Sequence, residues 1–344
     1  MEPPASSRAL VALRAKRGEF TALEALHDDL AVQPLLMLDA VPEGKVERLL
    51  NRVEKAVRQL WDLGRSLMID ATAVSPGPGA VLERLNQRLE PVAALFMEDA
   101  PVPFIPVVHA GADLALLTRV SQLSGEIGHG CAVRIDVRAT SADAFLHLLE
   151  RLASDPARVD LVLDAGYVAG PDQQLVDRML ALLDGLPDYR EYRSITVLSG
   201  SVPKQLEQIH RWEQPRFEEM LWHTVKASTS DSVRFGDYGA VHPAPTAPWP
   251  SKHINLKYTC ADHWLYFRQP LREPDDENAR ASALRLVSAE LLNSGSFSGS
   301  GYSWGDDRFA EAADGRGAGL GGTSVPVAFA TSHHLAYLSE FAAA

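Results

Sequence analysis

Residues 131–136 have the sequence CAVRID, and this stretch decides the fold that we expect for the chain. Its apolar residues predict a short β-strand in a protein core. Arg134 and Asp136 are two residues apart, so in a strand they project to the same face. A buried charge is stable only where it is paired or reaches solvent. The stretch therefore predicts a core strand with polar groups at its carboxyl end.

The same pattern, an apolar run that ends in a polar residue, recurs along the chain. It predicts eight strands at 8–14, 34–39, 66–70, 102–109, 131–136, 159–164, 194–199 and 231–239. Apolar residues at helical spacing lie between these strands and predict helices. The first contains Leu23, Leu26 and Leu30, and another begins after an N-cap at Thr140 or Ser141. The others lie at 43–63, Val81 to Leu89, 113–127, 171–183, 203–210 and 213–226.

Strands that alternate with helices in this way predict an α/β fold, a (β/α)8 barrel of the TIM type. The near-continuous apolar character of the middle strands fits a parallel sheet that is buried on both faces. A doubly wound open sheet is the alternative, but the early turns lack the glycine-rich phosphate loop that it requires.

We place the barrel at residues 1–240 and an elaboration packed on it at 241–344. The elaboration begins in a proline-rich connector, 240–253, which is expected to be extended. Two strands at 253–259 and 263–269 predict a hairpin, and 279–293 predicts a helix. Glycine-rich loops are expected around the SWGDD motif, 303–307, and the SHH motif, 332–334. We expect both motifs to be exposed, as a lid or an interaction surface.

Composition limits the classes of function. The 344 residues are 46% hydrophobic, and the formal net charge of −12 disfavours broad binding to nucleic acid or anionic membranes. Cys131 and Cys260 are the only cysteines, which predicts a reduced, cytoplasmic protein. No apolar run approaches the length of a membrane span, and the N-terminus does not resemble a signal peptide.

In a barrel of this type, functional groups lie at the carboxyl ends of the strands. Those ends carry several carboxylates, two cations and a histidine, a set that suits acid–base chemistry or binding of a hard cation. The candidates are Lys16, Asp39, Asp70, His109, Arg134, Asp136, Asp164, Ser199 and Asp237.

Each candidate also has a structural interpretation. A carboxylate after a strand often caps the next helix or a turn. His109 alone is compatible with a satisfied structural histidine. Arg134 requires a partner, which is either a neighbour, Asp136 or Asp164, or the anionic group of a ligand. Lys16 and Glu19 form either a surface pair at a helix start or part of the mouth.

Familiar catalytic signatures are absent from the sequence, including the P-loop, the GxSxG elbow, HExxH and paired CxxC motifs. The ordered set of short motifs resembles instead the phage beta protein family (T4-type beta family proteins). The resemblance rests on ALRAKRGEFTAL at 12–23, FGDYG at 235–239, NLKYT at 255–259, WLYFR at 264–268, YSWGDD at 302–307 and SHH at 332–334. Two positions depart from it: Met37 stands where a glutamate is expected, and a tryptophan is missing before the paired histidines.

The resemblance implies a TIM-type barrel of undefined biochemistry with an association with phage exclusion or antiviral defence. It marks Lys16, Glu19, Asp237, Tyr238, Tyr258, Trp264, residues 303–306, His333 and His334.

We expect a polar pocket for a phosphorylated or anionic small molecule or nucleotide, with a hydrolase or phosphodiesterase-like activity if the protein is an enzyme. Asp136, Asp164, Glu19 and Asp237 are the expected catalytic residues. Lys16, Arg134, His109, Trp304, His333 and His334 are the expected binding residues. Asp70, Asp136 and Asp164 are the expected ligands if a divalent metal such as Mg²⁺ is used. The alternative is a non-catalytic defence or regulatory component whose C-terminal loops bind a protein partner from a neighbouring defence gene.

Overall fold

The structure is a computed structural model of the whole chain, and it describes residues 9–26, 31–75, 77–90, 102–229, 233–245 and 251–341. Some sequence predictions fall outside these ranges. They are the first residue of strand 8–14, Leu30, the start of strand 231–239 and residues 246–250 of the connector.

The chain divides into two compact units. The first contains Val32–Ser199, Glu218–Asp237 and the N-terminal segment through Ala15. The second contains Lys16–Ala31, Gly200–Phe217 and Tyr238–Ala344. The predicted boundary at 240/241 therefore differs from the division that the structure shows, because two earlier segments also belong to the second unit.

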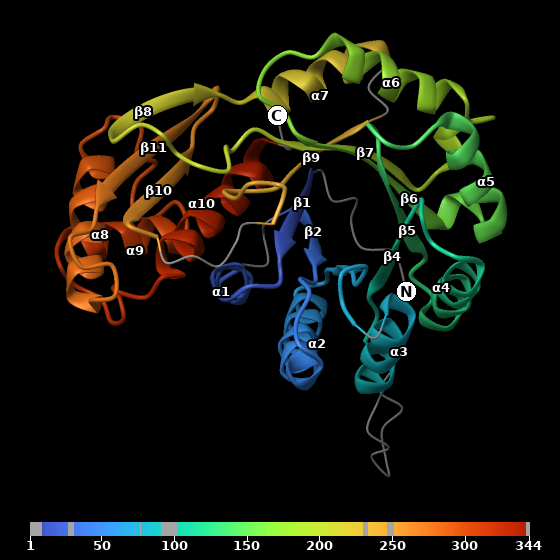
Figure 1. Cartoon of the computed structure of the whole chain (residues 1–344), viewed down its shortest axis with the longest axis horizontal. Helices are drawn as coiled ribbons and strands as arrows, with labels where there is room; N and C mark the ends of the chain where they lie inside the picture. Colours follow the sequence, from blue (N-terminus) through green and yellow to red (C-terminus); the bar gives the residue numbers. More distant parts are fainter. Residues whose placement is uncertain are drawn as a thin grey trace. The chain divides into compact units, whose positions relative to one another are not determined.

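The first unit is a closed barrel of eight parallel strands in the order β1-β2-β3-β4-β5-β6-β7-β9 (Figure 1). The strands are β1 Ala9–Arg14, β2 Val32–Met37, β3 Met68–Asp70, β4 Ile105–His109, β5 Cys131–Asp136, β6 Val159–Tyr167, β7 Ser194–Gly200 and β9 Arg234–Asp237. The predicted fold class is confirmed, and each expected strand overlaps an observed one.

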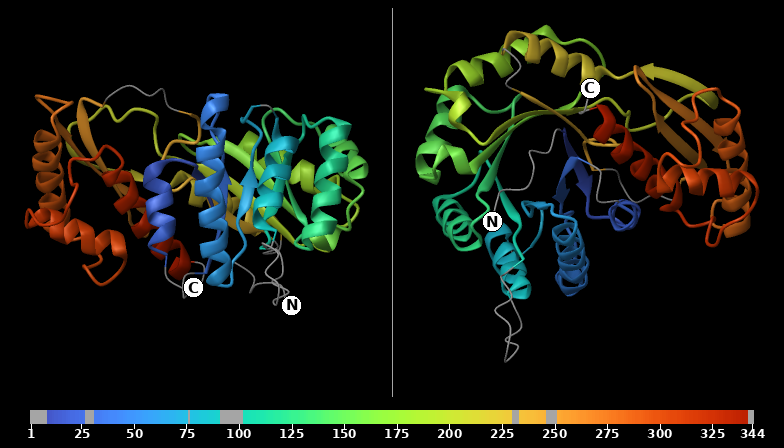
Figure 2. Two further views of the ribbon diagram at one scale, coloured as in Figure 1. Left: turned by 90° about the horizontal axis from the view of Figure 1, so that it is seen from below. Right: turned by 180° about the vertical axis from the view of Figure 1, so that it is seen from behind.

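Helices on the outside of the barrel follow the strands (Figure 2). They are α2 Val46–Asp62, α3 Pro78–Leu89, α4 Leu114–Ile127, α5 Ala142–Leu152, α6 Gln173–Asp184 and α7 Phe217–Ser228. Several begin at residues that the sequence marks as caps. For example, the Ser141 side chain accepts a hydrogen bond from the Ala144 amide at the start of α5.

The core of the barrel consists of strand residues with almost no exposure. All six residues of β1 are buried, and so are the first five of β5. A parallel strand covered on both faces excludes water from both sets of side chains, so a continuous apolar run is more stable there than an alternating one. The apolar runs end where the strands reach the mouth, and Asp70 and His109 are the last residues of their strands at this end.

The second unit contains a three-stranded antiparallel sheet in the order β10-β11-β8. Its strands are β8 His210–Pro215, β10 His253–Thr259 and β11 His263–Pro270, and its helices are α1 Arg17–Glu24, α8 Glu277–Leu292, α9 Trp304–Ala313 and α10 Val325–Phe341. One face of β10 and β11 packs on α8, α9 and α10 through a core that includes Leu256, Tyr258 and Leu284. The predicted hairpin and the helix near 279–293 are confirmed.

The predicted helix at 203–210 is wrong. In the structure residues 203–209 are irregular, and β8 begins at His210 and pairs with β11. This strand also replaces the start of the predicted helix 213–226, and α7 begins only at Phe217. Residues 210–215 form a strand because β11 of a distant hairpin pairs with them, and the local sequence does not indicate this partner. The expected exposure of the SHH motif is also wrong, because His333 and His334 lie inside α10 with no exposed surface.

Among the described residues, none of the helices is both long enough and apolar enough to cross a membrane.

Candidate functional site

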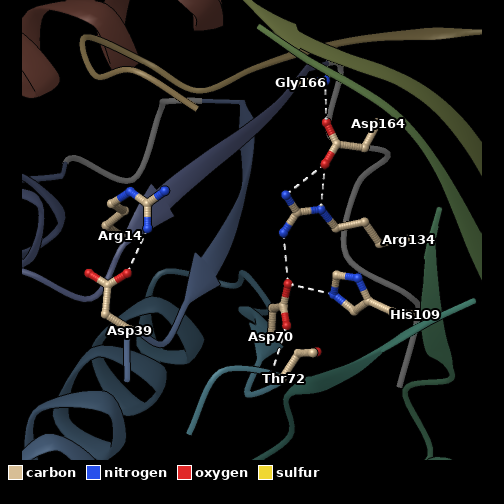
Figure 3. Close-up of polar contacts among 8 residues, drawn as sticks. All are labelled: Arg14, Asp39, Asp70, Thr72, His109, Arg134, Asp164 and Gly166. Atoms are coloured by element: carbon tan, nitrogen blue, oxygen red, sulfur yellow. Dashed lines mark hydrogen bonds and ion pairs between the residues drawn. The ribbon is translucent and has the colours of Figure 1, made fainter. Parts of the chain in front are cut away.

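Four predicted residues meet at the carboxyl ends of neighbouring barrel strands: Asp70, His109, Arg134 and Asp164 (Figure 3). Asp70 and His109 are the last residues of β3 and β4, while Arg134 and Asp164 lie near the ends of β5 and β6. Parallel strands in register bring these positions to one edge. The backbone register pairs His109 with Arg134 directly.

Arg134 links two carboxylates. Its Nη1 donates to Asp70 Oδ2 at 2.7 Å, while Nε and Nη2 donate to Asp164 Oδ2 at 3.0 and 2.7 Å. The side chain of Arg134 is only 11% exposed. A guanidinium in this position needs such partners, because burying an unpaired charge costs several kcal/mol of folding free energy. Of the alternatives open at the sequence level, pairing with Asp164 is observed, and Asp70 is an additional partner.

Backbone amides also donate hydrogen bonds to both carboxylates. The Thr72 amide donates to Asp70 Oδ1 at 3.1 Å, and the Gly166 amide donates to Asp164 Oδ1 at 2.8 Å. Each aspartate thus also organises the turn that follows its strand. The expectation that a carboxylate after a strand caps a turn is therefore correct for Asp70 and Asp164. It accounts for Oδ1 of each residue, while Oδ2 of each binds Arg134.

His109 is bound to Asp70 and remains partly exposed. Its Nε2 lies 2.8 Å from Asp70 Oδ2, and 30% of its side chain is exposed. Within the part of the chain that the structure describes, its Nδ1 makes no hydrogen bond. Because a carboxylate only accepts, Nε2 carries the proton in the neutral ring, and Nδ1 carries the lone pair.

The electrostatics of Asp70 favour its ionised form. Burial raises the pKa of Asp70, but the hydrogen bond and charge of His109 and the charge of Arg134 outweigh burial and hold this pKa well below its ordinary value. Asp70 is therefore a permanent acceptor for His109 at physiological pH. An aspartate–histidine pair with an accessible second nitrogen can take up and release a proton.

A second ion pair occupies the same end of the barrel. Arg14, the last residue of β1, donates to Asp39 at 2.6 Å, and only 8% of its side chain is exposed (Figure 3). Asp39 is among the residues predicted from the sequence, whereas Arg14 is not. The strand-end rule applied to residues 8–14 would have found it, because Arg14 closes that apolar run.

The other predicted barrel residues are not part of the cluster. Asp136 is exposed, and its Oδ1 accepts from the Arg138 amide at 2.8 Å, which makes it a turn-forming residue. Asp237, at the end of β9, is buried, as is Ser199 beside it in β7. The predicted metal ligands Asp70, Asp136 and Asp164 do not converge, since Arg134 lies between Asp70 and Asp164. Among the described residues, no three histidine, cysteine or acidic side chains are placed to hold a metal ion.

Lys16 and Glu19 belong to the second unit. Lys16 is exposed at the N-cap position of α1, and Glu19 is buried in its first turn. Trp304 is half-buried and lines a cavity of about 380 Å³ in the second unit, together with Tyr302 and Asp307.

His333 and His334 are held by internal contacts of the second unit. Nδ1 of His333 lies 2.9 Å from Asp306 Oδ2, and its Nε2 lies 2.9 Å from the Thr259 carbonyl. Nδ1 of His334 lies 2.7 Å from Thr259 Oγ1. Both imidazoles are thus structural parts of a polar core, which the sequence could not distinguish from an exposed motif.

Fold and site together define the class of the protein: a (β/α)8-barrel protein with a buried charge network and a partly exposed histidine at its mouth. The beta protein family model matches residues 11–340, so the chain belongs to the beta protein family.

One curated relative is glucosyl-3-phosphoglycerate synthase from Mycolicibacterium smegmatis, which is 28% identical over 125 residues, or 35% of this chain and 41% of that protein. The chain thus spans about two fifths of the length of that relative.

Similar solved structures include the YdjI aldolase from Escherichia coli, at 9% identity and a TM-score of 0.38 over 67% of this chain and 75% of that chain. GH26C from a Muricauda species is similar at 13% identity and a TM-score of 0.38, over 63% of this chain and 74% of that chain.

Proposed function

We propose that the protein is an enzyme that transfers protons at the carboxyl end of its barrel, with His109 as the general acid and base. The observation that carries the proposal is the asymmetry of the His109 ring. Asp70 holds Nε2, while Nδ1 makes no hydrogen bond among the described residues and the side chain is 30% exposed. A ring that a carboxylate holds by one nitrogen, with its other nitrogen open to solvent, can exchange a proton with a bound substrate.

The residues around His109 would then act through it. Asp70 fixes the orientation of the ring and stabilises the imidazolium that forms when Nδ1 accepts a proton. His109 and, to a smaller extent, Arg134 keep Asp70 ionised, and Asp164 holds Arg134 from the other side. Because both aspartates are also fixed by backbone amides, the ring is held in one geometry before a substrate arrives.

The charges favour a substrate that presents a hydroxyl or another neutral donor to His109. Two carboxylates surround the single guanidinium of Arg134, so this cluster has a net negative charge when His109 is neutral. Arg134 therefore provides poor support for the anion contact expected from the sequence. If the substrate is phosphorylated or otherwise anionic, its charge needs a cation other than Arg134, whose guanidinium already pairs with Asp70 and Asp164.

The experiment is a comparison of metabolite turnover. The purified full-length protein and its His109→Gln variant are each incubated with a mixture of small hydroxylated and phosphorylated metabolites, and substrate loss is followed by mass spectrometry. We expect at least one compound to be consumed by the wild-type protein and to be consumed at least 100-fold more slowly by the variant, the lower range for loss of a general base.

His147→Gln is the matched control, because His147 is 75% exposed on α5 and pairs with Glu150 away from the cluster. It should retain full turnover. Equal metabolite profiles for the wild-type protein and His109→Gln would refute the proposed role of His109.

The alternative of a non-catalytic component that binds a partner through its C-terminal loops has less support. The two histidines assigned to that surface are fully buried, and SWGDD forms the start of α9. For the biological setting, we propose a cytoplasmic role in phage exclusion or defence on the basis of family membership. Plaque counts test this role on cells that express the wild-type protein, cells that express His109→Gln and cells without the gene. The wild-type protein should lower the count and His109→Gln should not. Equal counts on cells with the wild-type protein and cells without the gene would contradict the role.

A further inference from the structure

Lys257 occupies an unusual position in the second unit. In β10, Ile254, Leu256 and Tyr258 face the apolar core, so Lys257 projects from the opposite face. There it is half-buried, directly opposite Tyr266 on β11. Tyr266 belongs to an apolar cluster with Trp264 and Ala240, so the stem of Lys257 leaves the sheet beside apolar and aromatic groups.

The amine of Lys257 has few partners. Its Nζ donates one hydrogen bond, of 2.8 Å, to the carbonyl of Ala240. An ammonium has three N–H donors, and within the described ranges this is the one acceptor that Nζ contacts. No carboxylate of these ranges forms an ion pair with it, although the charge of Glu19 acts on it from a longer distance.

This environment favours the neutral amine. Burial lowers the pKa of Lys257 to about 8, and the negative charge of Glu19 opposes this shift. A neutral amine carries a lone pair, and lysines in such settings are nucleophiles for carbonyl groups.

A neighbouring acceptor indicates what else a ligand would carry. Asn255 precedes Lys257 by two residues and projects from the same face, about 7 Å away along the strand. Its Oδ1 is buried and makes no hydrogen bond among the described residues. A buried acceptor without a donor is costly, and the hydroxyl of a ligand would satisfy it.

We propose that Lys257 is a reactive amine that forms a Schiff base with a hydroxylated aldehyde or ketone, whose hydroxyl group donates to Asn255. The Nζ lone pair attacks the carbonyl carbon, a C–N bond forms, and the carbonyl π electrons move to oxygen. A proton passes from nitrogen to that oxygen, and loss of water gives the imine. This site lies in the second unit and is independent of the role proposed for His109.

The test is reductive labelling of the folded full-length protein at neutral pH. The protein is treated with lactaldehyde or with propanal, which has the same carbon chain without the hydroxyl group, in the presence of cyanoborohydride. This reagent delivers hydride to the iminium carbon and converts the imine to a stable secondary amine. Peptide mass spectrometry then gives the labelling rate of each lysine.

Lys252 is the internal control, because it is exposed and lies five residues earlier. We expect lactaldehyde to label Lys257 at least tenfold faster than Lys252, and the advantage to be smaller with propanal. In Asn255→Ala the two aldehydes should label Lys257 equally. Labelling of Lys257 no faster than that of Lys252 would overturn the proposal, and an equal advantage with both aldehydes in the wild-type protein would overturn the assigned hydroxyl contact.

Glu19→Gln provides a second measurement. Loss of the negative charge should increase the neutral fraction of Lys257 and accelerate its labelling severalfold while Lys252 is unchanged. Slower labelling in this variant would contradict the assigned effect of Glu19 on the amine.

Discussion

An aspartate–histidine pair of the barrel and a buried pair of the second unit have nearly the same nitrogen–oxygen distance but differ in exposure to solvent. His109 lies 2.8 Å from Asp70 at the end of the barrel, and His333 lies 2.9 Å from Asp306 between α9 and α10. The side chain of His109 is 30% exposed, whereas that of His333 has no exposed surface. The pair distance alone therefore says little about the role of a histidine.

The second ring nitrogen distinguishes the pairs. In His333 it is bound to the Thr259 carbonyl, and the ring stacks on Tyr258 with centroids 3.7 Å apart. Asp306 also accepts hydrogen bonds from Tyr258 and Ser303, so every group in this network has a partner. Burial and the Asp306 charge raise the pKa of the Tyr258 phenol, which keeps it a donor. A satisfied network of this kind stabilises the fold, while an accessible nitrogen remains available for chemistry.

The largest effect is expected for Asp306→Ala. The substitution leaves His333, Tyr258 and Ser303 without their shared acceptor in a fully buried site, so we expect a loss of about 3–5 kcal/mol in the free energy of unfolding of the second unit. Hydrogen exchange in α9 and α10 of the full chain measures it. Asp307→Ala is the control, because the Asp307 side chain is 47% exposed. Similar protection in both variants would show that the buried network contributes little.

An intermediate loss in the free energy of unfolding of the barrel is expected at low pH. The folded-state pKa of Asp70 lies below its ordinary value of 3.8, so the unfolded chain binds this proton more readily. Ionised Asp70 therefore stabilises the folded barrel above pH 4. This contribution, on the order of 2 kcal/mol, is lost as the pH falls toward the folded-state pKa.

Denaturation at pH 6 and pH 3 measures this loss for the wild-type protein and Asp70→Asn. The difference in stability between the two proteins should narrow at pH 3. A difference that is constant between the two pH values would mean that Asp70 is not stabilised in its ionised form.

The smallest effect on stability is expected for His109→Gln. Glutamine retains a donor for Asp70, and the histidine is partly exposed, so the free energy of unfolding should change by less than about 1 kcal/mol. His333→Gln should cost several times more, because a glutamine cannot replace both hydrogen bonds and the stacked ring. Thermal denaturation of the two variants tests the comparison. Equal losses would place His109 in the same structural class as His333.

Much of the candidate site was predictable because of the way barrels are built. Asp70, His109, Arg134 and Asp164 each follow or end an apolar run, and parallel strands bring such positions to one edge. Their pairing was not predictable, because the partner of Arg134 depends on register and rotamers. Asp136 illustrates this limit: it shares a strand with Arg134, but its carboxylate turns to the Arg138 amide.

The sequence by itself determined the barrel, since eight apolar runs separated by amphipathic helices can bury their surfaces in few other ways. It also indicated that Asp70 and His109 end their strands, as the structure shows. Features outside that periodic pattern depend on the tertiary structure alone. They are the strand at His210–Pro215, the burial of His333 and His334, and the single hydrogen bond of the Lys257 amine. These features depend on partners that are distant in the chain, and local sequence carries no record of which segments will cover them.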